Sequence, residues 1–226
     1  MKASEIFQRV HTIVQDIGGV RWPFAELCMW LNDGQKEIVL QKPSASSRTV
    51  KIPLQSGTLQ AIPAEYIMLL RVVRNSAGRP VTVVARDLMD AQAPDWHQSR
   101  ERSDAKHAII DEADPKSFYV YPANDGTGEL EVIMSAVPAV IVATGDPALL
   151  ESYDMETSIN SIYDNALVDY VVYRSHSKDM QNAGAAQRAA LHYQQFANSL
   201  GMKVTLDANM NPNAKARVAA AAGGVA

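Results

Sequence analysis

Cysteine, long apolar runs and an excess of one charge are all scarce in this sequence. Cys28 is the only cysteine among 226 residues, which excludes an internal disulfide framework and suits a reducing compartment. No stretch approaches the roughly 18 apolar residues that cross a bilayer. Residues 1–16 mix charged and apolar side chains and lack the apolar core of a signal peptide. We therefore expect a soluble chain that is not exported by a recognisable route and does not contact a membrane.

The weak charge balance also argues against a nucleic-acid-binding surface. The 21 Lys and Arg residues face 25 Asp and Glu residues, so the net charge is −4. Residues 71–106 are the most basic stretch, with seven Lys or Arg against five Asp or Glu, but Trp96 is their only aromatic residue. A platform for nucleic acid needs several aromatic side chains and a stronger positive charge. We expect these arginines to be paired within the domain or across a subunit interface.

Motifs of known chemistry are missing too. None of the five histidines lies in a metal-ligand spacing, and no phosphate-binding loop or nucleophile elbow is present. We therefore expect no cofactor, no metal and no catalytic residue. The one acidic cluster is Asp111, Glu112 and Asp114, and it has two interpretations. In the first, the protein is a tail-associated cell-wall hydrolase that uses a pair of carboxylates, with Glu112 or Asp114 as a catalytic residue. In the second, the cluster is a solvated loop between two strands that ends at Asp114–Pro115.

Hydrophobic periodicity predicts helices at both ends of the chain and strands in the middle. Residues 4–17 repeat apolar side chains at helical steps, from Ile6 to Ile17, and Gly18–Gly19 end the repeat. Further helices are expected at about 23–43, 159–171 and 185–200, the last with Gly201 as its C-cap. A short helix is expected at 86–91. The predicted strands are 49–54, 67–74, 80–86, 106–111, 117–121 and 129–136, with a turn at 75–78 and a hairpin loop at 125–128.

These patterns predict an α+β fold, mainly an α-helical bundle with a β-rich insertion and an extended C-terminal tail. Residues 1–45 and 147–201 would form the bundle body, and residues 46–146 would form the insertion. Residues 202–226 would form an extended arm, because eight of these 25 residues are alanine and almost none could form a core. We predict that this arm binds a partner through Lys203, Asp207, Lys215 and Arg217. The alternative is a tail that packs on its own domain.

Short motifs spread over residues 1–201 resemble the phage head-to-tail adaptor (connector) protein family. In chain order they are Trp30-Leu31-Asn32-Asp33 with Gln35 and Pro43, Gly57 to Pro63, Arg74-Asn75 with Arg79, Leu88 with Asp90, Pro94 and Trp96, Asp114-Pro115, Phe118 to Pro122, Tyr163 to Tyr170, Tyr173-Arg174-Ser175 with Ser177-Lys178-Asp179, and Phe196 with Leu200-Gly201. Each motif is short, and it is their order and spacing that carry the resemblance.

The resemblance implies a structural virion protein with no catalytic residues. Its expected partners are the portal protein above, a tail or nozzle protein below, and other copies of itself in a ring, typically of twelve. The ring would join the capsid to the tail, and DNA would leave through its bore without specific binding. The expected location is the head–tail interface of the virion, after synthesis in the host cytoplasm.

Overall fold

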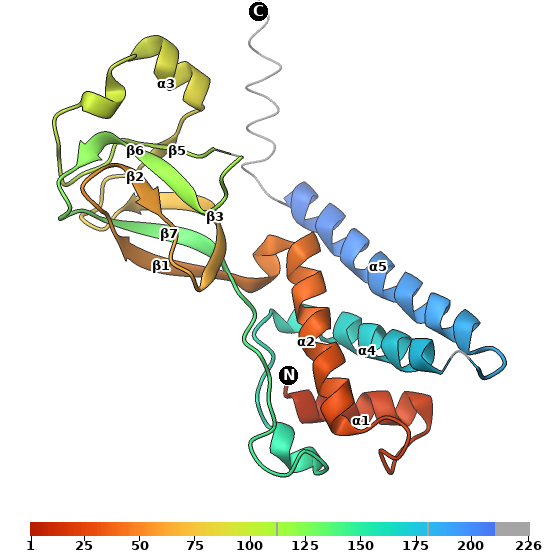
Figure 1. Ribbon diagram of the computed structural model, residues 1–226. Helices are drawn as coiled ribbons and strands as arrows, with labels where there is room; N and C mark the ends of the chain where they lie inside the picture. Colours follow the sequence, from red (N-terminus) through yellow and green to blue (C-terminus); the bar gives the residue numbers. More distant parts are fainter. Residues whose placement is uncertain (112, 180, 211–226) are drawn as a thin grey trace, which may run out of the picture. The chain divides into compact units, whose positions relative to one another are not determined.

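The computed structural model describes residues 1–111, 113–179 and 181–210, which fold into two compact units (Figure 1). The helical unit consists of Met1–Lys42 and the chain from Pro138 on, and the β unit consists of Pro43–Val137. The β unit is therefore inserted between two parts of the helical unit. The α+β class predicted from the sequence is confirmed, whereas the predicted domain limits, including a separate arm at 202–226, stay a prediction.

The helical unit is built around one central helix, which is labelled α4 in Figure 1. Its helices are α1 (Ala3–Val14), α2 (Phe24–Gln41), α4 (Asp164–Lys178) and α5 (Ala185–Met210), with short 3₁₀ turns η3 (Leu150–Tyr153) and η4 (Ser161–Tyr163). Helices α1, α2 and α5 each pack against α4. Because α4 has neighbours on several sides, its Ala166, Leu167, Val171 and Val172 are fully buried.

The core residues predicted for this unit are confirmed. Trp30, Leu31, Tyr163, Leu167 and Tyr170 are at most 7% exposed. Helix α2 packs closely on α4 at Gly34, where an added Cβ would lie 2.9 Å from the Tyr170 ring. Tyr170 in turn contacts Phe196 of α5, with ring centroids 5.1 Å apart. The aromatic residues of α4 and α5 thus pack together, and α2 lies against them at Gly34.

Two helix ends differ from the sequence prediction. Helix α1 stops at Val14, three residues earlier than expected, because Gln15 adopts the left-handed conformation at φ 59° and turns the chain before the two glycines. Ile13 and Ile17 are consequently 45% and 88% exposed, although Ile6 and Val10 of the same predicted stripe are fully buried. Gly201 does not cap α5, since this helix continues to Met210.

The β unit contains two antiparallel-rich sheets that enclose its core. One sheet has the order β1-β7-β3 and the other β2-β6-β5-β4. The strands are β1 (Ser47–Pro53), β2 (Gly57–Ala61), β3 (Tyr66–Asn75), β4 (Thr82–Val83), β5 (His107–Ile109), β6 (Ser117–Asn124) and β7 (Glu129–Ala136). Phe118, Val120, Leu130 and Val132 alternate with outward-facing residues along β6 and β7 and are fully buried between the sheets. Helix α3 (Arg86–Gln92) and the 3₁₀ turns η1 (Pro43–Ser46) and η2 (Trp96–Gln98) complete the unit.

The strand pairing corrects the predicted hairpin at 125–128. This loop joins β6 to β7, but the two strands lie in different sheets and do not pair with each other. Strand β7 pairs instead with β1, where Ser47 is the register partner of Ser135. The chain therefore enters and leaves the β unit on adjacent strands. Strand β2 was not among the predicted strands, because its five residues alternate too briefly to be separated from a turn.

Candidate functional site

The acidic cluster of the β unit does not have the geometry of a general acid. Asp114 is exposed, and its two carboxylate oxygens accept hydrogen bonds from the Ser117 hydroxyl at 2.7 Å and from the Lys116 backbone N–H at 3.0 Å. The Ser117 bond is the larger of the two effects that lower the pKa of Asp114. Such a carboxylate stays ionised and fixes a turn. Glu112 lies outside the described residues.

Arginines of the predicted basic stretch form ion pairs inside the β unit. Arg86 lies 3.0 Å from Asp111, and Arg74 lies 2.6 Å from Glu131. Within the described residues, no three His, Cys, Asp or Glu side chains are arranged to hold a metal ion. Arg74 and Arg86 are thus paired within the β unit, as the sequence predicted for the arginines of this stretch.

The predicted partner-binding residues fall in two places. Lys203 and Asp207 lie in the last turns of α5, so this part of the predicted extended arm is helical. Lys215 and Arg217 lie outside the described residues. Their role in partner binding stays a prediction.

A polar network in the helical unit fixes the loop between α1 and α2, and its centre is Asp16. One carboxylate oxygen of Asp16 accepts from the backbone N–H of Val20 at 3.2 Å. The other accepts from the backbone N–H groups of Arg21 and Trp22, both at 2.9 Å. Burial raises the pKa of Asp16. The hydrogen bonds from the three backbone N–H groups lower it by more than burial raises it, so the pKa lies below its usual value. The ionised carboxylate holds the loop in one conformation.

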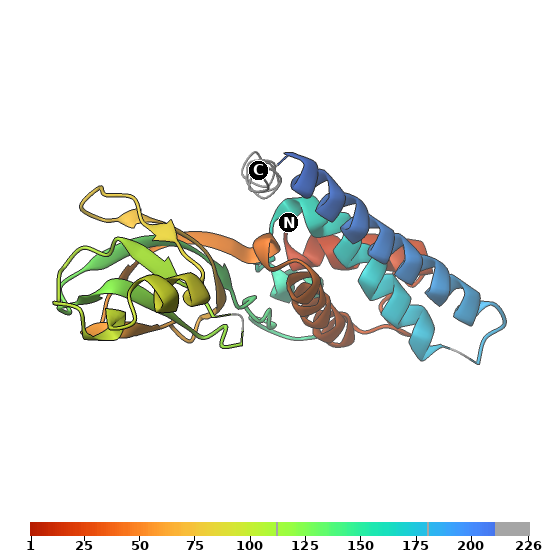
Figure 2. The same cartoon turned by 90° about the horizontal axis from the view of Figure 1, so that it is seen from above.

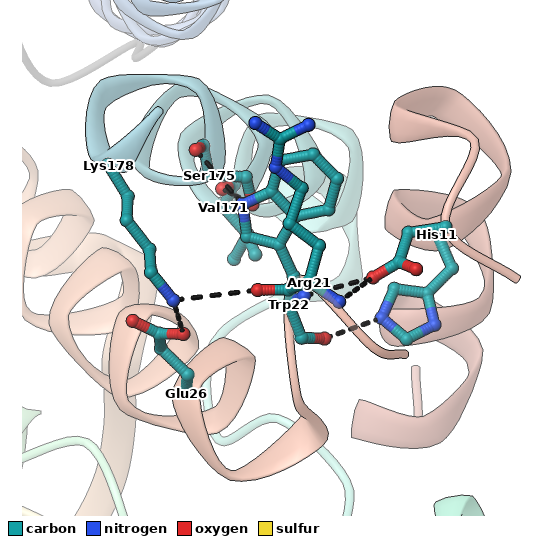
Figure 3. A network of polar contacts seen from close by, with 8 residues as sticks. His11, Arg21, Trp22, Glu26, Val171, Ser175 and Lys178 are labelled. Carbon is teal, nitrogen blue, oxygen red and sulfur yellow. Dashed lines mark hydrogen bonds and ion pairs between the residues drawn. The ribbon is translucent and has the colours of Figure 1, made fainter. Parts of the chain in front are cut away.

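Trp22 connects this loop to the helices on either side (Figure 3). Its indole Nε1 donates to the backbone carbonyl of Ser175 in α4 at 3.0 Å. Its own carbonyl accepts from Nε2 of His11 in α1 at 2.9 Å, and because a carbonyl can only accept, Nε2 carries the proton. Lys178 of α4 bonds Glu26 of α2 at 2.5 Å and reaches the Arg21 carbonyl at 3.5 Å. These bonds tie the loop to α1 and α4, and the Lys178–Glu26 pair joins α4 to α2.

A polar pocket of about 520 Å³ lies beside this loop, at the turn between α4 and α5. Its charged and titratable lining residues are Arg21, His176, Asp179, Arg188 and His192. Arg21 pairs with Asp179, and His192 bonds Asp169 at 3.0 Å. Burial, and next the charge of Arg188, lower the pKa of His176, so this ring stays neutral near pH 7. We refer to this group as the α4–α5 pocket.

Sequence reasoning missed both the loop network and the α4–α5 pocket. The residues that form them are up to 158 positions apart in the chain, as Arg21 and Asp179 are. Only Asp16, placed just before two glycines, gave a local signal, because Asp commonly bonds backbone N–H groups in turns. The other contacts depend on how α4 packs against α1 and α2.

The family model described as SU10 adaptor protein matches residues 1–216. The chain therefore belongs to the SU10 adaptor protein family, a family of phage adaptor proteins, and the resemblance stated from the sequence is confirmed. This membership implies a structural, non-enzymatic role and binding to other virion components.

No curated protein matches the chain in sequence. Among the helices that the structure describes, none is both long and apolar enough to cross a membrane.

Proposed function

We propose that this chain is the head-to-tail adaptor of a tailed phage. Copies of it, twelve in the expected ring, would sit beneath the portal protein and carry a tail or nozzle protein. DNA would leave the capsid through the bore of the ring. The observation that carries the proposal is the match of the SU10 adaptor protein model to nearly the whole chain.

The charge of the chain is consistent with this role. A net charge of −4 per copy gives a ring no overall attraction for phosphate, so DNA would slide through the bore without tight binding. The ion pairs of Arg74 and Arg86 within the β unit also support weak binding of DNA, since paired arginines are less available to phosphate.

We also propose that residues 202–226 dock on the portal protein or on a neighbouring copy. Lys203, Asp207, Lys215 and Arg217 give this segment a charge of +2, whereas residues 1–201 carry −6. Phe196 and Leu200 of α5 are buried, so the helical unit has apolar contacts with α5 that lie before this segment. Fixing the segment on a partner costs backbone entropy, about 1–2 kcal/mol per residue, so many contacts per arm are required. A ring that presents many arms at once would supply avidity.

Electron microscopy of the chain mixed with the portal protein of the same phage tests the adaptor role. A ring on the portal is the expected result, and a chain that stays unbound overturns the proposal. Truncation after Gly201 tests the arm: the truncated chain should keep its melting temperature but lose portal binding. Undiminished binding by the truncated chain would exclude the docking arm while leaving the adaptor role intact.

A further inference from the structure

An acidic segment lies at one end of the helical unit. Residues 138–163 contain four acidic side chains and neither Lys nor Arg. These four, Asp146, Glu151, Asp154 and Glu156, are all exposed. Asp154 pairs with Lys2 at 2.7 Å, whereas Glu151 and Glu156 make no ion pair within the described residues. The segment therefore presents uncompensated negative charge, with exposed Val142 and Leu149 beside it.

The α4–α5 pocket has the opposite character. Arg21 is paired with Asp179, His192 is bonded to Asp169 and the ring of His176 is neutral, so the positive charge that the pocket leaves open is that of Arg188. Arg188 is exposed and makes no ion pair within the described residues. Val20, next to Arg21 in the chain, is 87% exposed, so this surface also combines charge with an apolar side chain.

No residue of the acidic segment lines the α4–α5 pocket of its own chain, although Leu150 lines another pocket together with His11 and Ile17. The acidic segment is bound to the N-terminal end of α1, where Thr157 N–H donates to the Met1 carbonyl and Asp154 pairs with Lys2. The pocket includes Ile13, Val14 and Gln15 at the C-terminal end. Figures 1 and 2 both show the segment around η3 separated along the unit from the turn between α4 and α5.

We propose that these surfaces join neighbouring copies of this chain head to tail, with the acidic segment of one copy docked at the α4–α5 pocket of the next. The proposal rests on the ring of the proposed function and specifies which residues form its subunit contact. Two different, complementary patches on one chain produce a heterologous contact, which is the type that closes into a ring when the rotation between copies allows it. A two-fold dimer would instead need one self-complementary patch.

Preorganisation makes the pocket side suitable for such a contact. Asp16 and Trp22 fix the loop that carries Val20 and Arg21, so little conformational entropy is lost when a partner docks there. Exposed ion pairs alone contribute little affinity. These ion pairs mainly determine the specificity of the contact. The exposed apolar side chains on both surfaces contribute the apolar area that is buried when two copies associate. The contact is therefore specific but weak for a single pair of copies.

Charge reversal with the isolated chain tests the contact without any partner. At protein concentrations on the order of 1 mM, where weak contacts are populated, sedimentation velocity at low salt should show self-association. Arg188→Glu should weaken it roughly tenfold or more, and Glu151→Arg with Glu156→Arg should do the same. Combining all three changes should restore it. Lys36→Glu is the matched control, because Lys36 is exposed on α2 outside both surfaces, and it should leave self-association unchanged.

Zero-length cross-linking supplies an independent readout. In a mixture of isotopically light and heavy Arg188→Lys chains, carbodiimide should join position 188 of one chain to a carboxylate within residues 138–163 of another. Charge reversals without effect, an equal effect of Lys36→Glu, or failure of the combined variant to recover would each overturn the head-to-tail contact.

The portal mixture separates this inference from the proposed function. Copies with Arg188→Glu that bind portal but do not close into rings would support the contact. Copies with Arg188→Glu that still form normal rings would overturn it while the adaptor role stands. Self-association that follows the charge swap, in a chain that never binds portal, would support the contact and overturn the adaptor role.

Discussion

The indole nitrogen of Trp22 donates a 3.0 Å hydrogen bond to the backbone carbonyl of Ser175. This bond joins the loop after α1 to the last turn of α4, 153 residues away in the chain. Both groups are buried, since Trp22 is 4% exposed and Ser175 is fully buried. The bond is thus protected from water on both sides.

Trp22→Phe should remove this hydrogen bond while keeping an aromatic ring at the buried position of Trp22. The free energy of unfolding should fall by about 1–3 kcal/mol, because the indole contacts are partly lost and the bond is not replaced. Urea denaturation measures the loss. Tyr193→Phe, which removes a hydroxyl from a side chain 44% exposed, should change stability by less than about 0.5 kcal/mol. Equal effects of the two changes would mean that the Trp22 bond does not stabilise the fold.

Asp16→Asn should destabilise the chain in a pH-dependent way. The pKa of Asp16 is lower in the folded chain than its usual value, so its contribution is present above the unfolded pKa and is lost as pH falls through the folded pKa. At pH 7 the variant should be less stable by about 1–3 kcal/mol, because an amide oxygen accepts these backbone bonds less strongly than a carboxylate. Denaturation at pH 7 and near pH 3 should show the difference shrinking toward acid pH. A difference independent of pH would contradict the role of the ionised carboxylate.

Gly34→Ala and Gly201→Ala should act in opposite directions. At position 34 the new Cβ would lie 2.9 Å from Tyr170 and 3.2 Å from Leu167, and overpacking of this kind costs about 1–3 kcal/mol. At position 201 nothing lies within 4 Å of the new Cβ, and alanine is the better helix former, so stability should rise by up to about 1 kcal/mol. Thermal melting of the two variants compares them directly. A stabilised Gly34→Ala would show that α2 and α4 pack less closely than the structure indicates.

Trp30→Ala should be among the most damaging single changes. Trp30 is 7% exposed, and truncation of a buried Trp costs about 3–5 kcal/mol. We expect an insoluble or largely unfolded product, which the soluble fraction and circular dichroism would reveal. A folded variant that loses one specific partner would instead make Trp30 a binding residue.

The isolated chain should be largely monomeric at micromolar concentrations. The proposed contact between copies depends mainly on exposed charges, which are screened by salt and weak for one pair of copies. Light scattering of the purified chain should therefore give the mass of one copy. A stable dodecamer in the absence of portal would contradict assembly that depends on the partner.

The sequence predicted elements well where the pattern was local. Helix α2 was bounded correctly because Pro23 and Pro43 flank it, and α4 was located from its apolar stripe. Periodicity failed at Ile17, because a regular apolar spacing does not reveal whether a face is covered by the same chain or left open. The hairpin prediction failed because Asp125–Gly126 specifies a turn but not which strand each arm will pair with. The α4–α5 pocket required knowledge of tertiary packing that no local pattern contains.

The register of Ser47 with Ser135 has an evolutionary consequence. Since the chain enters and leaves the β unit on paired strands, the two ends of the insertion are held side by side by the unit's own hydrogen bonds. The Ser46 hydroxyl donates a 2.7 Å hydrogen bond to the Ala136 carbonyl and so also holds these two ends together. An insertion of another size or fold whose two ends are equally close would fit at the same point of the helical unit. The sequences of the two units can therefore change at different rates during evolution.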